Sequence, residues 1–350
     1  WLGEHGVDDK IPAPTVDATN PQESRIVSGY FNYTTLIADG RWDRWNFVRK
    51  WWSIYANDSR WAPPRYSLLR RAVSADPHLA RQHPVLLSLE AFPGRRRSPA
   101  GGMEFNQPGA IMDVPVAASV LLCDPRRRDG TAYLGLLRCV NDEESLERYI
   151  SAALEQAAVF GRYRLVGPTG LSPHLGSGVL LDHFHIVPPL HTPYNPPYLP
   201  ELMESVLTPV VTHRLFHLVT PQTPQPSAGP AQIVRLSLAD CEATLIPLVV
   251  ESFVAEDEFP TPDAEEAAFL LRWPAGYPLS VWGAIIDGRL AGYIALQPDF
   301  AAVTARARGG KNLLWRVWLG WRVTRPVRAG RLVLGGVLPE YRGQGIGRQL

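Results

Sequence analysis

The sequence predicts a mixed α/β fold, with a mixed and mostly antiparallel sheet in each half of the chain. In the first half, residues 131–140 (TAYLGLLRCV) are typical of a strand, residues 141–160 of a helix and residues 163–166 of a second strand. In the second half, Asp287-Gly288 lies between two apolar runs and favours the tight turn of an antiparallel hairpin. The 33 prolines among 350 residues argue against long uninterrupted helices.

A proline-rich segment divides the chain. Residues 221–232 (PQTPQPSAGPAQ) contain four prolines and no hydrophobic period, which is typical of a semi-rigid linker. A chain of 350 residues is long enough for two domains that each bury a core. We therefore expect one domain over residues 1–220 and a second over residues 233–350.

Helix and strand boundaries follow from capping residues and apolar patterns. Asn141 or Asp142 is expected to cap the helix in the first half. After the linker, residues 233–238 predict a strand and residues 241–253 a helix capped by Asp240. The hairpin strands are expected at residues 281–286 and 290–296, and residues 331–337 (RLVLGGV) predict a buried strand.

Residues 311–323 (KNLLWRVWLGWRV) predict a helix with Trp315, Trp318 and Trp321 at a spacing of three. Aromatic residues that alternate with arginines suit a helix on a membrane surface. Amphipathic helices that pack on their own protein are much commoner. We therefore expect this helix to cover a sheet or an acceptor site.

The distribution of charge is more informative than the net charge of +1. Residues 301–350 contain ten Arg or Lys and a single acid, whereas residues 241–270 contain eight acids and no Arg or Lys. The small net charge does not favour nucleic-acid binding. No apolar run reaches about 18 residues, so we expect no stable membrane insertion and a cytoplasmic protein. Because the chain begins with Trp1 and ends inside a motif, we expect both ends to be cut.

The cysteines and histidines do not form a metal-binding pattern. Cys123, Cys139 and Cys241 are widely spaced without a C-x-x-C pair, which predicts buried thiols rather than disulfides or a zinc site. His183-Phe184-His185 and His191 lack a carboxylate or cysteine partner at ligand spacing. We expect surface or core histidines and no metal.

The last residues hold the motif with the clearest chemistry. After the strand at 331–337, Arg342, Gly345 and Gly347 form an R-x-x-G-x-G pattern at the start of a predicted helix. Glycines at 343, 345 and 347 leave the backbone N–H groups free to converge on a phosphate at the positive helix end, and Arg342 and Arg348 add positive charge. A nucleoside triphosphate loop would end in G-K-[ST], and a Rossmann loop would open a βαβ unit; neither pattern is present.

Residues 337–347 (VLPEYRGQGIG) resemble the acetyl-CoA binding motif of the GCN5-related N-acetyltransferases, over about twenty residues of specific match. The resemblance implies the acyl-CoA N-acyltransferase fold and acetyl-CoA as the acyl donor. It also implies that the main chain of Val337 pairs with the pantetheine arm, and that the amides from Arg342 to Gly347 bind the pyrophosphate. The donor-binding residues that it implies are Val337, Leu338, Arg342, Gly343, Gln344, Gly345, Ile346, Gly347 and Arg348.

The first half resembles a related group in which a degenerate domain of the same fold comes first. The resemblance is carried by residues 61–64 (WAPP), the strand-helix-strand stretch 133–166, and residues 194–198 (YNPPY). Where a phosphate loop would be expected, this half has Asn141-Asp142-Glu143-Glu144. Carboxylates there would cap the helix and repel a pyrophosphate, so we expect that this half does not bind coenzyme A in the usual way.

The family resemblance implies direct attack of an amine on the thioester, without a covalent enzyme intermediate. Cys241 therefore has no expected catalytic role, and a main-chain amide near Val337 is the expected oxyanion donor. The carboxylates considered as general base are Glu251, Glu256, Asp257 and Glu258, with Glu256 and Glu258 preferred; Glu340 is expected to face solvent.

The same resemblance implies that a tyrosine on a later helix protonates the thiolate, and this helix would lie beyond Leu350. The printed residues alone are therefore expected to lack that acid. The expected acceptor is a small-molecule or peptide amine, and a homodimer is possible. A second hypothesis is a non-catalytic protein of this fold that senses acetyl-CoA.

Overall fold

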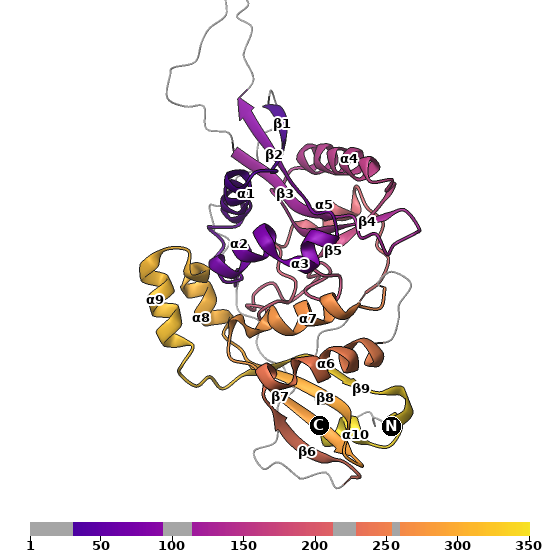
Figure 1. Ribbon diagram of the computed structural model, residues 1–350. Helices are drawn as coiled ribbons and strands as arrows, with labels where there is room; N and C mark the ends of the chain where they lie inside the picture. Colours follow the sequence, from indigo (N-terminus) through magenta and orange to yellow (C-terminus); the bar gives the residue numbers. More distant parts are fainter. Residues whose placement is uncertain (1–30, 94–113, 213–228, 254–259) are drawn as a thin grey trace, which may run out of the picture.

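The computed structural model describes residues 31–93, 114–212, 229–253 and 260–350, and contains two separate sheets (Figure 1). The first sheet has the strand order β1-β2-β3-β4-β5, and the second has the order β6-β7-β8-β9. Helices flank both sheets, which confirms the predicted mixed α/β class with a mostly antiparallel sheet in each half.

The first sheet is covered by helices on both faces. Its neighbouring strands are antiparallel except for β5, which runs parallel to β4. Alternate residues of the inner strands point to opposite faces: Val120 packs with the side of α1, whereas Leu121 packs with that of α4. The strands are β1 (Phe31–Ile37), β2 (Val85–Pro93), β3 (Val114–Leu122), β4 (Thr131–Cys139) and β5 (Arg164–Thr169); the helices are α1 (Arg41–Ile54), α2 (Tyr66–Ala75), α3 (Pro77–Arg81), α4 (Glu143–Val159) and α5 (Leu199–Glu204).

The second sheet is antiparallel throughout. Its strands are β6 (Gln232–Leu236), β7 (Ser280–Ile286), β8 (Arg289–Pro298) and β9 (Gly330–Val337). The helices α6 (Leu238–Ser252) and α7 (Ala264–Arg272) precede β7, and α10 (Ile346–Gln349) follows β9. Between β8 and β9, the chain forms α8 (Ala301–Arg306) and α9 (Leu313–Arg322); the short 3-10 turns are η1 (Pro274–Gly276), η2 (Arg308–Gly310) and η3 (Pro339–Tyr341).

The two halves repeat one order of elements. Each begins with a strand, continues through helices to an antiparallel strand pair, and then adds a further antiparallel strand followed by a helix. In the first half the repeat runs from β1 to α4 and in the second from β6 to α10, with α8 and α9 as an insertion. The architecture is therefore that of two similar α/β units in one chain.

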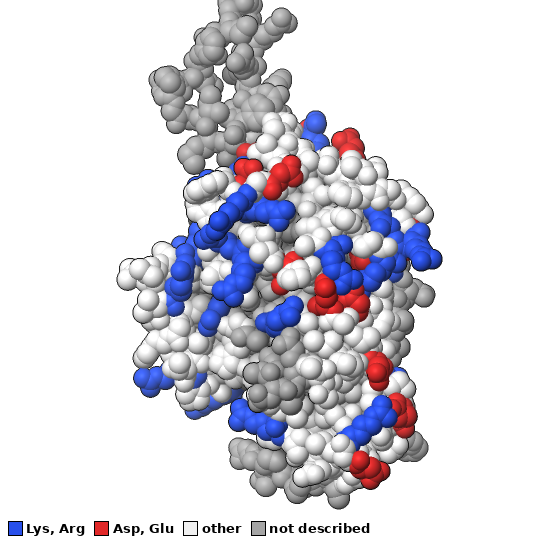
Figure 2. All heavy atoms as spheres, in the orientation of Figure 1, with Lys and Arg blue, Asp and Glu red and all other residues white. Residues whose placement is uncertain are grey.

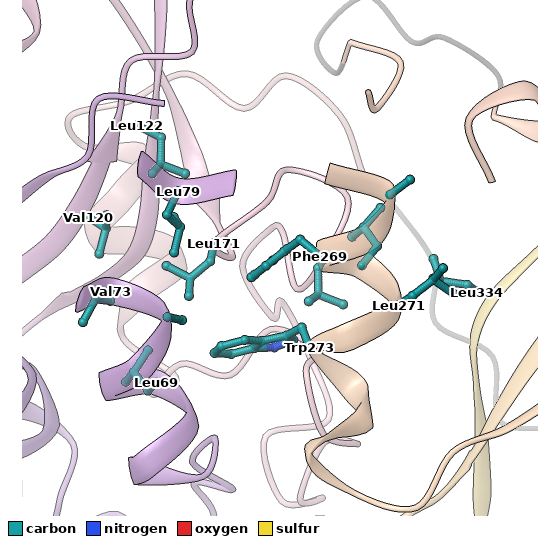
Figure 3. Packing of buried hydrophobic residues seen from close by; sticks show 14 of the residues in the cluster. Leu69, Val73, Leu79, Val120, Leu122, Leu171, Phe269, Leu271, Trp273 and Leu334 are labelled. Atoms are coloured by element: carbon teal, nitrogen blue, oxygen red, sulfur yellow. The ribbon is translucent and has the colours of Figure 1, made fainter. Parts of the chain in front are cut away.

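Helix α7 is packed against both units. Figure 3 shows Phe269 and Trp273 facing Leu69 and Leu79 of the first half, while Leu271 faces Leu334 of β9. All of these residues belong to one continuous buried cluster, and the ring of Phe269 stacks on His78 of α3 at 4.8 Å. The two sheets thus share part of their hydrophobic core through this helix.

A buried carboxylate lies at the same junction. Glu266 of α7 is fully buried, and it accepts hydrogen bonds from Ser172 Oγ at 2.8 Å and from Arg126 Nη2 at 2.6 Å. Arg126 also pairs with Asp124 at 2.6 Å. Both donors come from the first half, so the burial of Glu266 is tolerated only while the halves remain in contact.

Several local predictions are confirmed. The turn between β7 and β8 has Asp287 at φ 47° and Gly288 at φ 75°, the left-handed pair that Asp-Gly favours. Asp142 caps α4, because its Oδ2 accepts from the backbone N–H of Ser145 at 2.8 Å. The strands predicted at 131–140 and 290–296 correspond to β4 and β8.

Other predictions need correction. Helix α6 begins at Leu238 with Ser237 as its cap residue, because β6 already ends at Leu236; Asp240 is therefore inside the helix and is not the cap. Gln232, assigned to the linker, belongs to β6, and residues 221–228 lie outside the described ranges. Strand β9 is not buried: only Leu334 is, because within the described ranges β9 pairs with β8 alone.

Helix α9 does not cover a sheet, one of the two positions expected for it; a position over an acceptor site stays a prediction. The helix lies beside α8 at the margin of the molecule, away from both sheets in Figure 1, and its main contacts are with η2. Within the described part of the chain, no helix combines the length and apolar character needed to cross a bilayer.

We expect that Arg126→Met lowers the free energy of unfolding by about 3 kcal/mol, because the substitution leaves the buried Glu266 carboxylate without its cation. Urea unfolding followed by fluorescence measures this change. The matched control is Arg81→Met, which removes ion pairs from a half-exposed side chain to Asp263 and Glu265 and should cost far less. Equal losses in the two variants would contradict the assigned role of Glu266.

Candidate functional site

The site predicted from the sequence begins where β9 ends. The backbone N–H of Leu338 donates to the carbonyl of Ala291 on β8 at 2.9 Å. Since successive residues of a strand direct their backbone groups to opposite sides, the N–H of Val337 points to the edge of β9 that faces away from β8. Val337 therefore presents main-chain polar groups along the outer edge of the described sheet.

The following turn has a backbone conformation that requires glycine. Gly343 has φ 78° and Gly345 has φ 80°, in the left-handed region that side chains other than glycine rarely adopt. A Cβ at either position would meet no atom within 4 Å, so backbone conformation, rather than crowding, explains these two glycines. Ile346 is buried against Ala284 and Ala291, which fixes the start of α10 on the second sheet.

The amides of this turn have no acceptor of their own. From Gly343 to Gly347, none of the five backbone N–H groups donates to an acceptor within the described ranges, whereas the N–H groups of Arg348 and Gln349 donate to the carbonyl of Gly345 at 3.0 and 3.2 Å. Of these five residues, all but Ile346 are exposed. A run of free, exposed amides that leads into a helix has the donor groups that an anion requires.

The two arginines of the motif differ in role. The guanidinium of Arg342 donates to the carbonyl of Val337 at 3.1 Å and to that of Ser252, at the end of α6, at 2.9 Å. Its backbone N–H donates to Pro339 at 3.2 Å. Arg342 thus braces the turn against α6 through two of its five N–H donors. Arg348 is exposed, and no ion pair for it is found within the described ranges.

A close contact that the sequence analysis missed brings α6 next to this turn. A Cβ on Gly336 would lie 2.2 Å from Oγ of the buried Ser252. Glycine at 336 is therefore needed for the end of α6 to reach β9 and for Ser252 to offer its carbonyl to Arg342. The Gly335-Gly336 pair inside an apolar strand was the feature of the sequence that could have indicated this close approach.

The sequence of this part of the chain matches a known protein family. Residues 246–350 match the acetyltransferase (GNAT) family. The matched segment contains the last part of α6, α7, the antiparallel strands β7 to β9, and the glycine turn with its free amides. It also contains the α8–α9 insertion.

Similarity of the chain to solved structures and to curated proteins is weak or absent. A solved chain described as a tandem GNAT protein from the clavulanic acid biosynthesis pathway, without AcCoA, is 15% identical, with a TM-score of 0.45, over 91% of this chain and 83% of that chain. Identity and TM-score are both too low for any property to be transferred. No curated protein matches the chain.

The structure describes only some of the acidic candidates. Glu251 is exposed near the end of α6, and Glu256, Asp257 and Glu258 lie outside the described residues. Glu340 is exposed, as predicted, and pairs with Arg289 at 3.2 Å. The other expected donor-binding residues, Leu338 and Gln344, lie in the turn; Leu338 is buried, and Gln344 donates to the Glu340 carbonyl.

The corresponding position in the first half has a different chemistry. Asp142 accepts from the Ser145 N–H at the start of α4, and Glu143 and Glu144 add negative charge in its first turn. Beside the end of β4, the hydroxyl of Tyr198 donates to the Cys139 carbonyl at 2.9 Å. The buried guanidinium of Arg138 lies 3.7 Å from the ring centroid of Trp51 and 3.9 Å from that of Trp61. The first turn of α4 is thus acidic where the second half has glycines, and aromatic side chains pack beside the end of β4.

The histidines are surface or core residues, as expected. His183 is exposed and lies 3.0 Å from Asp182. His191 is partly buried, and its Nδ1 accepts from Trp273 Nε1 at 3.0 Å. Burial, helped by the charge of Arg331, lowers the pKa of His191 to about 3. A search of the described residues finds no group of three or more His, Cys, Asp or Glu that could hold a metal ion.

We expect the stability of the protein to fall as pH is lowered, in part through His191. Its folded pKa of about 3 lies below the unfolded value of about 6.5, so its contribution is complete above pH about 6.5 and is lost as pH falls toward 3, by up to about 1.4 kcal/mol per pH unit. His191→Asn keeps an acceptor near Nδ1 and removes the titration. Urea unfolding at several pH values should show a flatter pH dependence for the variant, and parallel curves would disprove this contribution.

We also expect Arg342→Met to lower the free energy of unfolding by about 1–2 kcal/mol, because two backbone carbonyls lose a charged donor. Hydrogen exchange should report faster exchange of the β9 and α10 amides. Arg348→Met, which removes an exposed arginine of the same segment, is the control and should leave both measurements unchanged. A change in Arg348→Met as large as that in Arg342→Met would refute the bracing role.

Proposed function

We propose that this protein is an acyl-CoA-dependent N-acyltransferase that transfers an acetyl group from acetyl-CoA to an amine. The run of five free amides from Gly343 to Gly347 carries the proposal, because it offers an anion site at the end of an open strand edge. The GNAT match over residues 246–350 supports the assignment of that anion as the pyrophosphate of coenzyme A.

Donor binding would use main-chain groups almost entirely. The amides from Gly343 to Gly347 would hold the pyrophosphate, and the exposed Arg348 would add positive charge. The outward N–H of Val337 would pair with the amide-rich pantetheine arm, as one strand pairs with the next. Arg342 would keep the turn in the conformation that directs these groups outward, through its bonds to Val337 and Ser252.

The chemistry is attack of a neutral amine nitrogen on the thioester carbon. The C–N bond forms, the C–S bond breaks, the thiolate leaves and takes up a proton, and the nitrogen gives up its extra proton. A main-chain amide near Val337 would stabilise the oxyanion. Glu256 and Glu258, or a water that one of them holds, remain our proposed base, and the acidic segment around them suits a cationic amine on a small molecule or peptide.

The two halves would have different tasks. We assign donor binding to residues 233–350. Because Asp142, Glu143 and Glu144 place negative charge at the start of α4, residues 1–220 would not bind coenzyme A in the usual way and would instead shape the acceptor site.

Calorimetric titration of acetyl-CoA into the full-length protein tests the donor site. We expect binding with a Kd near micromolar, weakened at least about tenfold by Gly345→Glu, which places a carboxylate among the amides. The matched control is Gly161→Glu, since Gly161 also has a positive φ, 69°, and open space around it, but lies in the first half. Equal affinity in Gly345→Glu and the natural protein would sink the proposal.

A turnover assay distinguishes a transferase from a protein that only senses acetyl-CoA. Release of the free thiol is measured with a panel of amines, from small diamines to peptides with a free N-terminus. Amine-dependent release that Gly345→Glu abolishes would support transfer. Tight binding without release from any amine would favour the non-catalytic alternative.

A further inference from the structure

Helix α9 carries an exposed apolar stripe to which the proposed function assigns no role. Leu313, Leu314, Val317 and Trp321 are 70%, 84%, 66% and 54% exposed. At about 100° per residue, these four side chains share one face of the helix, and the buried Leu319 lies on the opposite face. The helix therefore turns its most apolar side to solvent, the reverse of an ordinary surface helix.

The side of α9 opposite the stripe is packed against the rest of the protein. Leu319, Trp315 and Trp318 pack with Phe300 and Ala307 in a separate buried cluster, and the two tryptophan rings meet edge to face at 5.5 Å. The adjoining turn η2 is pressed against the first half: a Cβ on Gly309 would lie 2.6 Å from both the Pro64 carbonyl and the Trp52 ring. The exposed side chains thus project from a part of the molecule that is packed on its inner side.

Cations surround the stripe. Residues 301–339 contain eight Arg or Lys and no Asp or Glu. Arg306, Arg308, Lys311, Arg316, Arg325 and Arg328 are exposed, and the described residues provide no ion pair for any of them. In Figure 2, blue side chains also gather over the adjacent α1 and α2. Burial and then the nearby charges of Arg49 and Arg308 lower the pKa of Lys311, so these cations lie close enough to repel each other.

We propose that α9 docks this protein on the surface of an anionic phospholipid bilayer, with the four apolar side chains in the interface and the cations on lipid headgroups. An apolar stripe with a tryptophan and a basic border is the pattern that such a surface binds. A second copy of the chain would set one cationic border against another, which disfavours a twofold contact. A nucleic acid would leave Leu313, Leu314 and Val317 without an apolar partner.

Co-sedimentation with vesicles tests the docking. The full-length protein is mixed with vesicles of neutral phosphatidylcholine and with vesicles that contain about 30% phosphatidylserine, a typical anionic surface. We expect at least about tenfold stronger binding to the anionic vesicles, and a loss of that binding in high salt. The double variant Leu314→Glu and Val317→Glu should bind at least about tenfold more weakly, since each carboxylate opposes both apolar insertion and the surface charge.

Leu181→Glu is the matched control, because Leu181 is 54% exposed but lies outside the α9 surface. It should bind vesicles like the natural protein. Acetyl-CoA titration of every variant verifies that the GNAT-matching half remains folded, and sedimentation velocity reports association of copies. No preference for anionic vesicles, or equal loss in Leu181→Glu, would overturn the proposal. Association of copies that the double variant abolishes would show that the stripe is a protein interface instead.

Discussion

The arrangement of the two halves depends on one buried carboxylate. Glu266 is fully buried in α7 and is tolerable there only because Arg126 and Ser172 of the first half donate to it. The same helix packs Phe269 against the first half and Leu271 toward β9. A helix that belongs by sequence to the GNAT-matching segment therefore completes the core of the other half. The position of the donor turn relative to the first half is set by this shared helix.

The proposed donor site is held by contacts that lie away from any ligand. Positive φ angles at Gly343 and Gly345 direct the amides outward, while Arg342 ties the turn to the end of α6. That tie requires α6 to approach β9 as closely as Gly336 permits. Stability and binding are thus coupled through the backbone, and a change in α6 can alter donor affinity without touching the turn.

The sequence predicted the features that depend on neighbouring residues. Asp287-Gly288 specifies its turn by local backbone preference, and Asp142 caps α4 through an N–H only three residues away. The glycine turn was located for the same reason. Features that depend on distant contacts were missed: β9 was expected to be buried, although its exposure depends on which strands pair with it. The bond from the Arg342 guanidinium to the carbonyl of Ser252 on α6 was also missed, because these two residues are far apart in sequence.

The ends of the α8–α9 insertion meet at a single point. The backbone N–H of Asp299 donates to the carbonyl of Ala329 at 2.8 Å, at the end of the β8–β9 pair. The entropic cost of closing a loop rises only slowly with its length, so the sheet tolerates a long excursion here almost as well as a short turn. The exposed surface of the insertion can therefore vary while the register of β8 and β9, and with it the position of the glycine turn after β9, stays the same.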